Sequence, residues 1–152
     1  SAEELLSRIG QKFIVEPARI KKTDTGKPRR RHMFGMYLDG VWHQLTAKPG
    51  SFDHSDKLAR LDVNILQDNL LRPILGIQDP RTDKRIGFVG GIRGMAELRR
   101  LVDSGQAVVA FSLFPTSMAE LMGVADAGDI MPPKSTWFEP KLRDGIVIHT
   151  IG

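Results

Sequence analysis

The sequence predicts an α+β domain with a mixed sheet, and two observations lead to this class. First, Asp39-Gly40 separates two β-rich runs, which predicts an antiparallel hairpin near residues 32–47. Second, the chain after residue 85 alternates strand, helix, strand, helix and strand, which is the pattern of an α/β layer. We therefore expect a single domain over residues 1–152, in which the hairpin precedes a βαβαβ-like C-terminal half.

The first elements are short. Leu5, Ile9 and Phe13 share one helical face, which predicts a helix over about residues 2–11. The run FIVEP is typical of a short strand that ends at Pro17, because proline has no N–H to donate to a sheet.

The turn at Asp39-Gly40 determines the pairing of the hairpin, because both turn positions favour residues that tolerate a positive φ. Counting outward from the turn shows which side chains share a side of the hairpin, and the more apolar side is expected to face the core. On that side we expect Leu38 opposite Val41, Met36 opposite His43 and Phe34 opposite Leu45, with Tyr37 opposite Trp42 on the other side.

The middle of the chain carries apolar side chains at helical spacing over residues 61–76. Asp62 is the expected N-cap of this helix, and Pro73 and Gly76 are typical of its end. By the same periodicity rules we expect strands over residues 85–91, 107–114 and 145–151, and helices over residues 95–105 and 116–128.

The composition restricts the class of function. The net charge is +4, and the absence of cysteine excludes disulfides, thiolate metal sites and cysteine nucleophiles, and fits a reducing compartment. The sequence has no run of about 18 apolar residues that could span a membrane, and its acidic N-terminal segment lacks the pattern of a signal peptide. We therefore expect a cytoplasmic protein with no membrane partner.

The positive charge is concentrated in the segment RIKKTDTGKPRRR, residues 19–31, which holds seven basic residues and one acidic residue. We call this segment the basic loop. A solvated loop is the simpler interpretation, and we do not expect nucleic acid as a partner. The alternative is an arm that contacts phosphate or nucleic acid, although charge alone does not read a base sequence.

Two further clusters allow a structural and a functional interpretation. Glycines between residues 87 and 94 are typical of a tight turn, and the alternative is an anion-binding nest with Arg93 as its cation. The DHSD segment holds Asp53, His54 and Asp56, which we expect to cap a loop; acid–base chemistry is the alternative. No histidine has metal-ligand spacing, so we predict no metal site, and no cofactor is indicated.

The segment IMPPKSTWFEP, residues 130–140, predicts a stiff, anchored strap before the last strand. Two prolines favour extended backbone, and they also exclude a phosphate-binding P-loop because they lack N–H groups. An aromatic pair would anchor the strap to the core. Lys134, Ser135 and Thr136 would then be presented as one cation and two hydroxyls. A polar crossover between two elements is the alternative.

The segment MPPKSTWFEPKLRDGIVIH resembles the C-terminal signature of a prokaryotic family of uncharacterised proteins, the domain-of-unknown-function family 1015. The segments LDVNILQDNLLRPILGI and FGMYLDGVWHQL are similar to two further blocks of that family. Lys141 belongs to the same signature and joins the candidate ligand-binding residues.

The resemblance implies a longer protein. Family members carry an upstream D-G-H-H-R segment similar to the ParB-like superfamily, which includes nucleotide-using free-serine kinases, and this segment is not in the chain. We therefore expect an accessory C-terminal domain whose partner is an N-terminal domain of the same protein. The implied chemistry is phosphotransferase-like and near serine metabolism, with an anionic small molecule or nucleotide as ligand. By itself, the chain is expected to lack activity.

Overall fold

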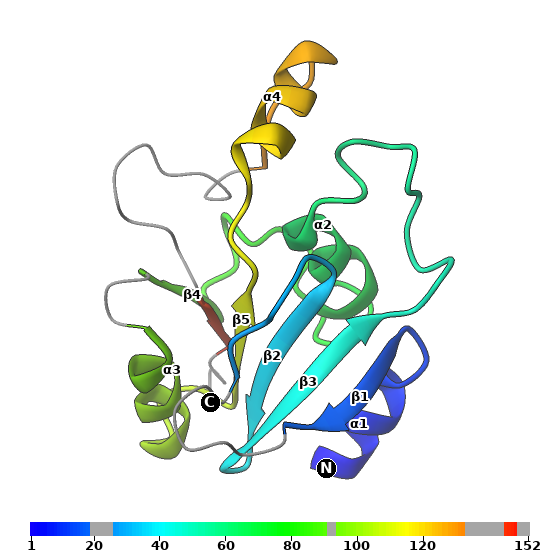
Figure 1. Cartoon of the computed structure of the whole chain (residues 1–152). Helices are drawn as coiled ribbons and strands as arrows, with labels where there is room; N and C mark the ends of the chain where they lie inside the picture. The colour runs from blue at the N-terminus through cyan, green and yellow to red at the C-terminus, as the bar shows by residue number, and fades with distance from the viewer. Residues whose placement is uncertain (19–25, 91–93, 133–144, 149–152) are drawn as a thin grey trace.

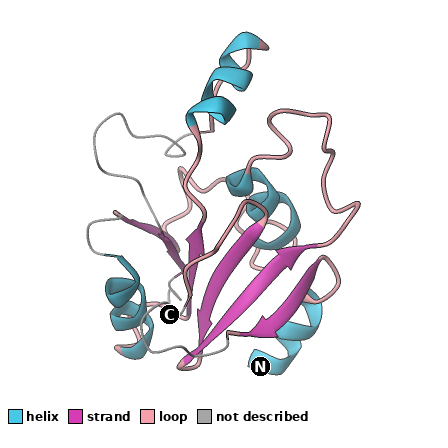
Figure 2. Ribbon diagram, viewed as in Figure 1, coloured by secondary structure: helices cyan, strands magenta, loops and turns pink. Residues whose placement is uncertain are grey.

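Six strands from both halves of the chain join in one sheet, with the strand order β1-β3-β2-β5-β6-β4 (Figures 1 and 2). The computed structural model describes residues 1–18, 26–90, 94–132 and 145–148. The strands are β1 (Phe13–Pro17), β2 (Met33–Leu38), β3 (Val41–Ala47), β4 (Ile86–Val89), β5 (Val109–Leu113) and β6 (Gly145–Ile148). The helices are α1 (Ala2–Ile9), α2 (Asp62–Leu66), the π-helix η1 (Gln67–Leu71), α3 (Gly94–Asp103) and α4 (Met118–Asp126).

The hairpin of β2 and β3 has the predicted turn and register. Asp39 and Gly40 have φ angles of 48° and 79°, which is the positive-φ pair that a two-residue turn of this kind requires. The pairs predicted across the hairpin, from Leu38 with Val41 to Phe34 with Leu45, are the observed Cα partners. The α+β class is therefore confirmed together with its clearest local element.

The sheet is antiparallel rather than mixed. β4 and β5 run in the same direction, as the βαβ pattern predicts, but β6 lies between them and pairs antiparallel with both. β5 also pairs antiparallel with β2, which joins the two halves of the chain. The βαβαβ-like expectation is thus correct for the direction of β4 and β5 but wrong for β6, which runs antiparallel to β5 and separates it from β4.

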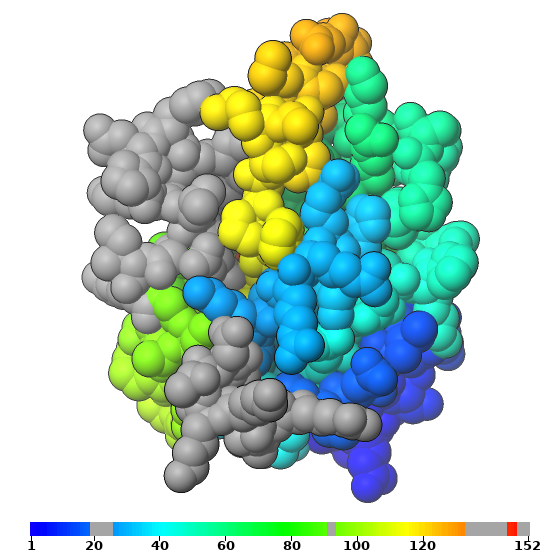
Figure 3. All heavy atoms as spheres, in the orientation of Figure 1, coloured from blue at the N-terminus to red at the C-terminus, as the bar shows by residue number. Residues whose placement is uncertain are grey.

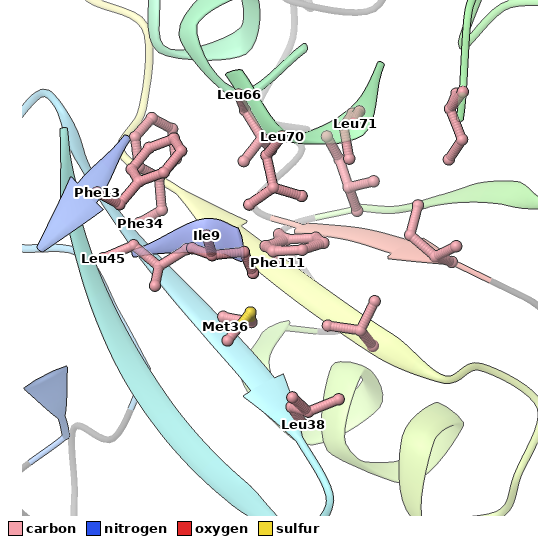
Figure 4. Packing of buried hydrophobic residues seen from close by; sticks show 14 of the residues in the cluster. Ile9, Phe13, Phe34, Met36, Leu38, Leu45, Leu66, Leu70, Leu71 and Phe111 are labelled. Carbon is pink, nitrogen blue, oxygen red and sulfur yellow. The ribbon is translucent and has the colours of Figure 1, made fainter. Parts of the chain in front are cut away.

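The main core lies between one face of the sheet and the helices α1, α2 and η1. Figure 4 shows the side chains of this cluster gathered against the sheet. α3 covers part of the opposite face, where Leu98 packs with Tyr37 and Trp42. Both faces of β2 are therefore covered, and all six of its residues are buried. The labelled members of the main cluster are Ile9, Phe13, Phe34, Met36, Leu38, Leu45, Leu66, Leu70, Leu71 and Phe111.

The helix at residues 62–71 differs from the prediction at its start. Leu61 is the N-cap and makes no side-chain capping bond, whereas Asp62 is the first helical residue and is buried. Its carboxylate accepts a hydrogen bond from the backbone of His32, which is distant in sequence, so it does not cap its own helix. The helix then continues as the π-helix η1 and ends before Pro73, as expected for a residue that cannot continue a helix.

α4 projects beyond the end of β5 (Figure 1). Ser117 is its N-cap and forms a capping box with Glu120, and Gly128 follows the helix with a φ angle of 75°. These are the start and stop signals expected for this helix. In the described part of the chain, no helix is long and apolar enough to cross a membrane.

Candidate functional site

Residues 26–32, which are the C-terminal part of the basic loop and the following His32, lie across the sheet face that is opposite the main core (Figure 1). The carbonyl oxygen of Gly26 accepts a hydrogen bond from the Ser112 hydroxyl of β5. A Cβ atom at Gly35 would overlap this carbonyl group, and a Cβ atom at Gly26 would overlap the ring of Trp42. Two glycines thus allow the loop backbone to contact the strand directly, so this half of the basic loop is fixed on the sheet.

A pocket of about 360 Å³ lies beside this contact, and its volume is within the range of small-molecule sites. Lys27 and Arg29 of the basic loop line one wall, and both side chains remain exposed to solvent. In the space-filling view, the light-blue residues that follow the grey segment lie on the front surface of the molecule (Figure 3). The complete lining is Glu16, Pro17, Ala18, Gly26, Lys27, Arg29, Phe34, Gly35, His43 and Gln44.

The strand register explains the polar floor of the pocket. Glu16 of β1 is the Cα partner of Gln44 in β3, and Gln44 is the partner of Gly35 in β2. Side chains that face each other across paired strands share one face of the sheet. Glu16 and Gln44 therefore lie side by side on the face that the loop crosses, and the missing side chain of Gly35 leaves room for the loop next to them.

The other end of residues 26–32 is tied to two helices. Arg31 Nη2 lies 2.9 Å from Oε1 of Glu120, which comes from α4. The backbone N–H of His32 donates a 2.9 Å hydrogen bond to Oδ1 of Asp62, the first residue of α2. His32 has a φ angle of 65°, an uncommon conformation for a residue with a side chain. The surrounding contacts therefore hold a strained residue at the end of the pocket wall.

The electrostatics of this polar cluster are unusual. Burial raises the pKa of Asp62 to about 7, and the negative charge of Glu120 adds to this effect. Burial lowers the pKa of His32 below its ordinary value, so the ring favours its neutral form. Oδ2 of Asp62 and Nε of Arg31 are buried and have no hydrogen-bond partner among the described residues. The cluster therefore holds one carboxyl group that changes its charge close to neutral pH.

The three candidate residues of the DHSD segment make different kinds of contact. Asp53 accepts hydrogen bonds from Ser55, and Asp56 accepts from the backbone of Leu58, as expected for a loop of caps. His54 instead lies near the polar cluster, with its ring centroid 6.1 Å from that of His32. The two carboxylates thus serve local turns, whereas the exposed ring of His54 lies beside the rings of His32 and Phe52.

The other predicted site residues cannot be compared with the structure. Lys134, Ser135, Thr136, Lys141 and Arg93 lie outside the described residues. Within the described ranges, no group of three or more His, Asp or Glu side chains is arranged to hold a metal ion.

No protein-family model, curated protein or solved structure matches the chain. The resemblance to the domain-of-unknown-function family 1015 therefore stays a prediction, and the candidate site rests on its geometry.

The sequence identified the charge of the basic loop but not the strand residues that line the pocket beside it. Glu16 and Gln44 have no local signal, because each is one polar residue on the outward face of a short strand. Gly35 offered a signal: a glycine within an otherwise apolar strand often marks the close approach of another backbone. That rule could have predicted that a loop lies on β2.

Proposed function

We propose that this domain binds a small anionic molecule, of the phosphate or carboxylate class, in the pocket between the basic loop and the sheet. One observation carries the proposal: the contact between Gly26 and Gly35 fixes the loop on the sheet, so that Lys27 and Arg29 line the pocket wall. A fixed wall loses little conformational freedom when a ligand binds, which favours affinity for a small molecule.

The chemistry of the wall suits an anion. Arginine offers a planar fork of donors to a phosphate or carboxylate, and lysine adds a compact positive charge. Neither Lys27 nor Arg29 forms an ion pair with another described residue. Their charges are therefore available to a ligand without first breaking an ion pair inside this part of the chain.

The broader setting follows from the resemblance. Under this proposal, the domain is the accessory C-terminal part of a cytoplasmic, phosphotransferase-like protein near serine metabolism, and an N-terminal domain completes the site. The strap residues Lys134, Ser135 and Thr136 would then act on the same anionic ligand. Support for this setting comes from the sequence signature alone.

Nucleic-acid binding is the second candidate, because Lys27, Arg29 and Arg30 are exposed on one short segment. Such binding would depend on total charge and would weaken steeply with salt. We favour the small molecule because Lys27 and Arg29 line a pocket, whereas binding of nucleic acid through total charge would not need one.

The neighbouring residues Arg29 and Arg30 provide a matched test. Both are exposed, but Arg29 lines the pocket and Arg30 does not. Calorimetric titration with ethyl phosphate and propionate should show saturable binding of at least one of them. Arg29→Ala should weaken that binding about tenfold or more, as expected for a lost charged hydrogen bond, while Arg30→Ala should change it little. Absence of saturable binding of either anion, or equal losses in both variants, would contradict the proposal.

A further inference from the structure

The pocket contains a negative charge as well as two positive ones. Glu16 of β1 lines the same pocket as Lys27 and Arg29, but it comes from the sheet, whereas the two cations come from the loop. On β1, Phe13 is completely buried in the main core, while Glu16 lies on the alternate face and is exposed. The carboxylate is therefore a feature of the pocket face and takes no part in core packing.

Glu16 has no ion-pair partner among the described residues, although two cations line the same pocket. Its neighbour across the strand pair is Gln44, whose amide can both donate and accept hydrogen bonds. The strand residues thus offer a ligand a carboxylate and an amide, whereas the side chains of Lys27 and Arg29 offer donors only. The sheet side and the loop side of the pocket therefore differ in electrostatic character.

A purely anionic ligand would not match this arrangement. Its negative group would gain from Lys27 and Arg29, but the remainder of the molecule would face an unpaired carboxylate. A ligand that carries a positive group on its other end would satisfy both sides, and complementary charge of this kind determines specificity.

We infer that the ligand is a small zwitterion, in which a phosphate or carboxylate contacts Lys27 and Arg29 and an ammonium group contacts Glu16 and Gln44. This inference rests on the proposed function, because it concerns the same pocket. It adds a class of substrate, the amino-alkyl phosphates and amino-carboxylates, and it assigns specificity to Glu16.

Two matched pairs of probes separate the amine from the anion. Phosphoethanolamine differs from ethyl phosphate, and β-alanine from propionate, by the ammonium group alone. In calorimetric titrations with the wild-type chain, the amine member of at least one pair should bind about fivefold more tightly or better, which corresponds to about 1 kcal/mol. In Glu16→Gln this preference should disappear, while affinity for the anion without the amine stays the same or rises. Glu3→Gln, which removes an exposed carboxylate of α1, should keep the preference.

The outcomes distinguish the two proposals. If neither member of either pair binds, the proposed function fails and this inference fails with it. If both members of each pair bind equally, the pocket is an anion site and only the zwitterion inference is overturned. A preference for the amine that persists in Glu16→Gln would also overturn it, since another group would then recognise the ammonium. Thermal melts of both variants should match the wild type, because the two side chains are exposed.

Discussion

The backbone N–H of His32 donates a 2.9 Å hydrogen bond to Oδ1 of Asp62, a residue that follows it by 30 positions. This bond joins the end of the basic loop to the first residue of α2. Because the carboxyl group is buried, its charge state affects the stability of the loop and of the helix together.

Replacing Asp62 with asparagine should remove a pH-dependent loss of folding stability. The pKa of Asp62 is raised to about 7 by burial in the folded chain, above the usual value of 3.8, so the folded state holds its proton more tightly than the unfolded state. The stability that this proton provides is complete below about pH 4 and is lost as the pH rises to about 7. The difference between these limits is on the order of 4 kcal/mol.

Urea unfolding at pH 5, 6, 7 and 8 checks this expectation. Asp62→Asn keeps an oxygen that can accept the hydrogen bond from His32, but its side chain does not ionise. The free energy of unfolding of this variant, relative to that of the wild type, should therefore increase as the pH rises. Because the lowered pKa of His32 acts in both proteins, its contribution largely cancels in the comparison. A constant difference between the two proteins across this range would show that Asp62 does not titrate there.

Glu120 should contribute more to the free energy of unfolding than an exposed acidic residue that also forms an ion pair. Its Oε1 pairs with Arg31, and its Oε2 accepts from the backbone and hydroxyl of Ser117 at 2.8 and 2.9 Å. Glu120→Ala should therefore destabilise the chain by at least about 2 kcal/mol. Asp68→Ala, which breaks an exposed pair with Arg72, should cost no more than about 0.5 kcal/mol. Similar losses in the two variants, measured by urea unfolding, would contradict this ranking.

Gly35→Ala should disturb the pocket from within the sheet. The new methyl group would overlap the carbonyl of Gly26, so the loop must shift, at a cost of about 1–3 kcal/mol. The anion affinity should fall as well, because the loop carries the pocket cations. Gly90→Ala is the control, since no described atom lies within 4 Å of its added Cβ. A Gly35→Ala variant with wild-type melting temperature and anion affinity would show that the loop is not held by this contact.

The hairpin turn offers an independent test of the register. Gly40 has a φ angle of 79°, and a β-branched residue resists this conformation even in open space. Gly40→Val should lower stability by about 1 kcal/mol or more, which a thermal melt would detect. An unchanged melting temperature would mean that the turn does not depend on positive φ at this position.

Sequence reasoning succeeded where the determining interactions are local. The register of β2 and β3 follows from Asp39-Gly40 and strict alternation, and α4 lies within the helix predicted over residues 116–128. The insertion of β6 between β5 and β4 depends instead on pairing between segments far apart in sequence. No turn signal or periodicity carries that information, so the mixed sheet was the wrong expectation.

The candidate site was harder to predict for the same reason. Asp62 has the sequence context of an N-cap, yet its partner is the amide of His32. Lys27 and Arg29 were recognised as charged, but the pocket beside them exists only because β1 and β3 bring Glu16 and Gln44 together. Local composition identifies the charges, and only the tertiary fold shows which groups they face.

The position of β6 has a consequence for how the chain folds during synthesis. Among the described strands, β4 pairs only with β6, although the ribosome makes α3, β5 and α4 between the two. The hairpin of β2 and β3 can form as soon as it emerges, because its contacts are local. β4 must wait as an unpaired, partly apolar edge until β6 appears. β6 therefore completes the interior of the sheet, and ribosome-bound chains that stop before residue 145 should bind chaperones more strongly than chains that extend beyond β6.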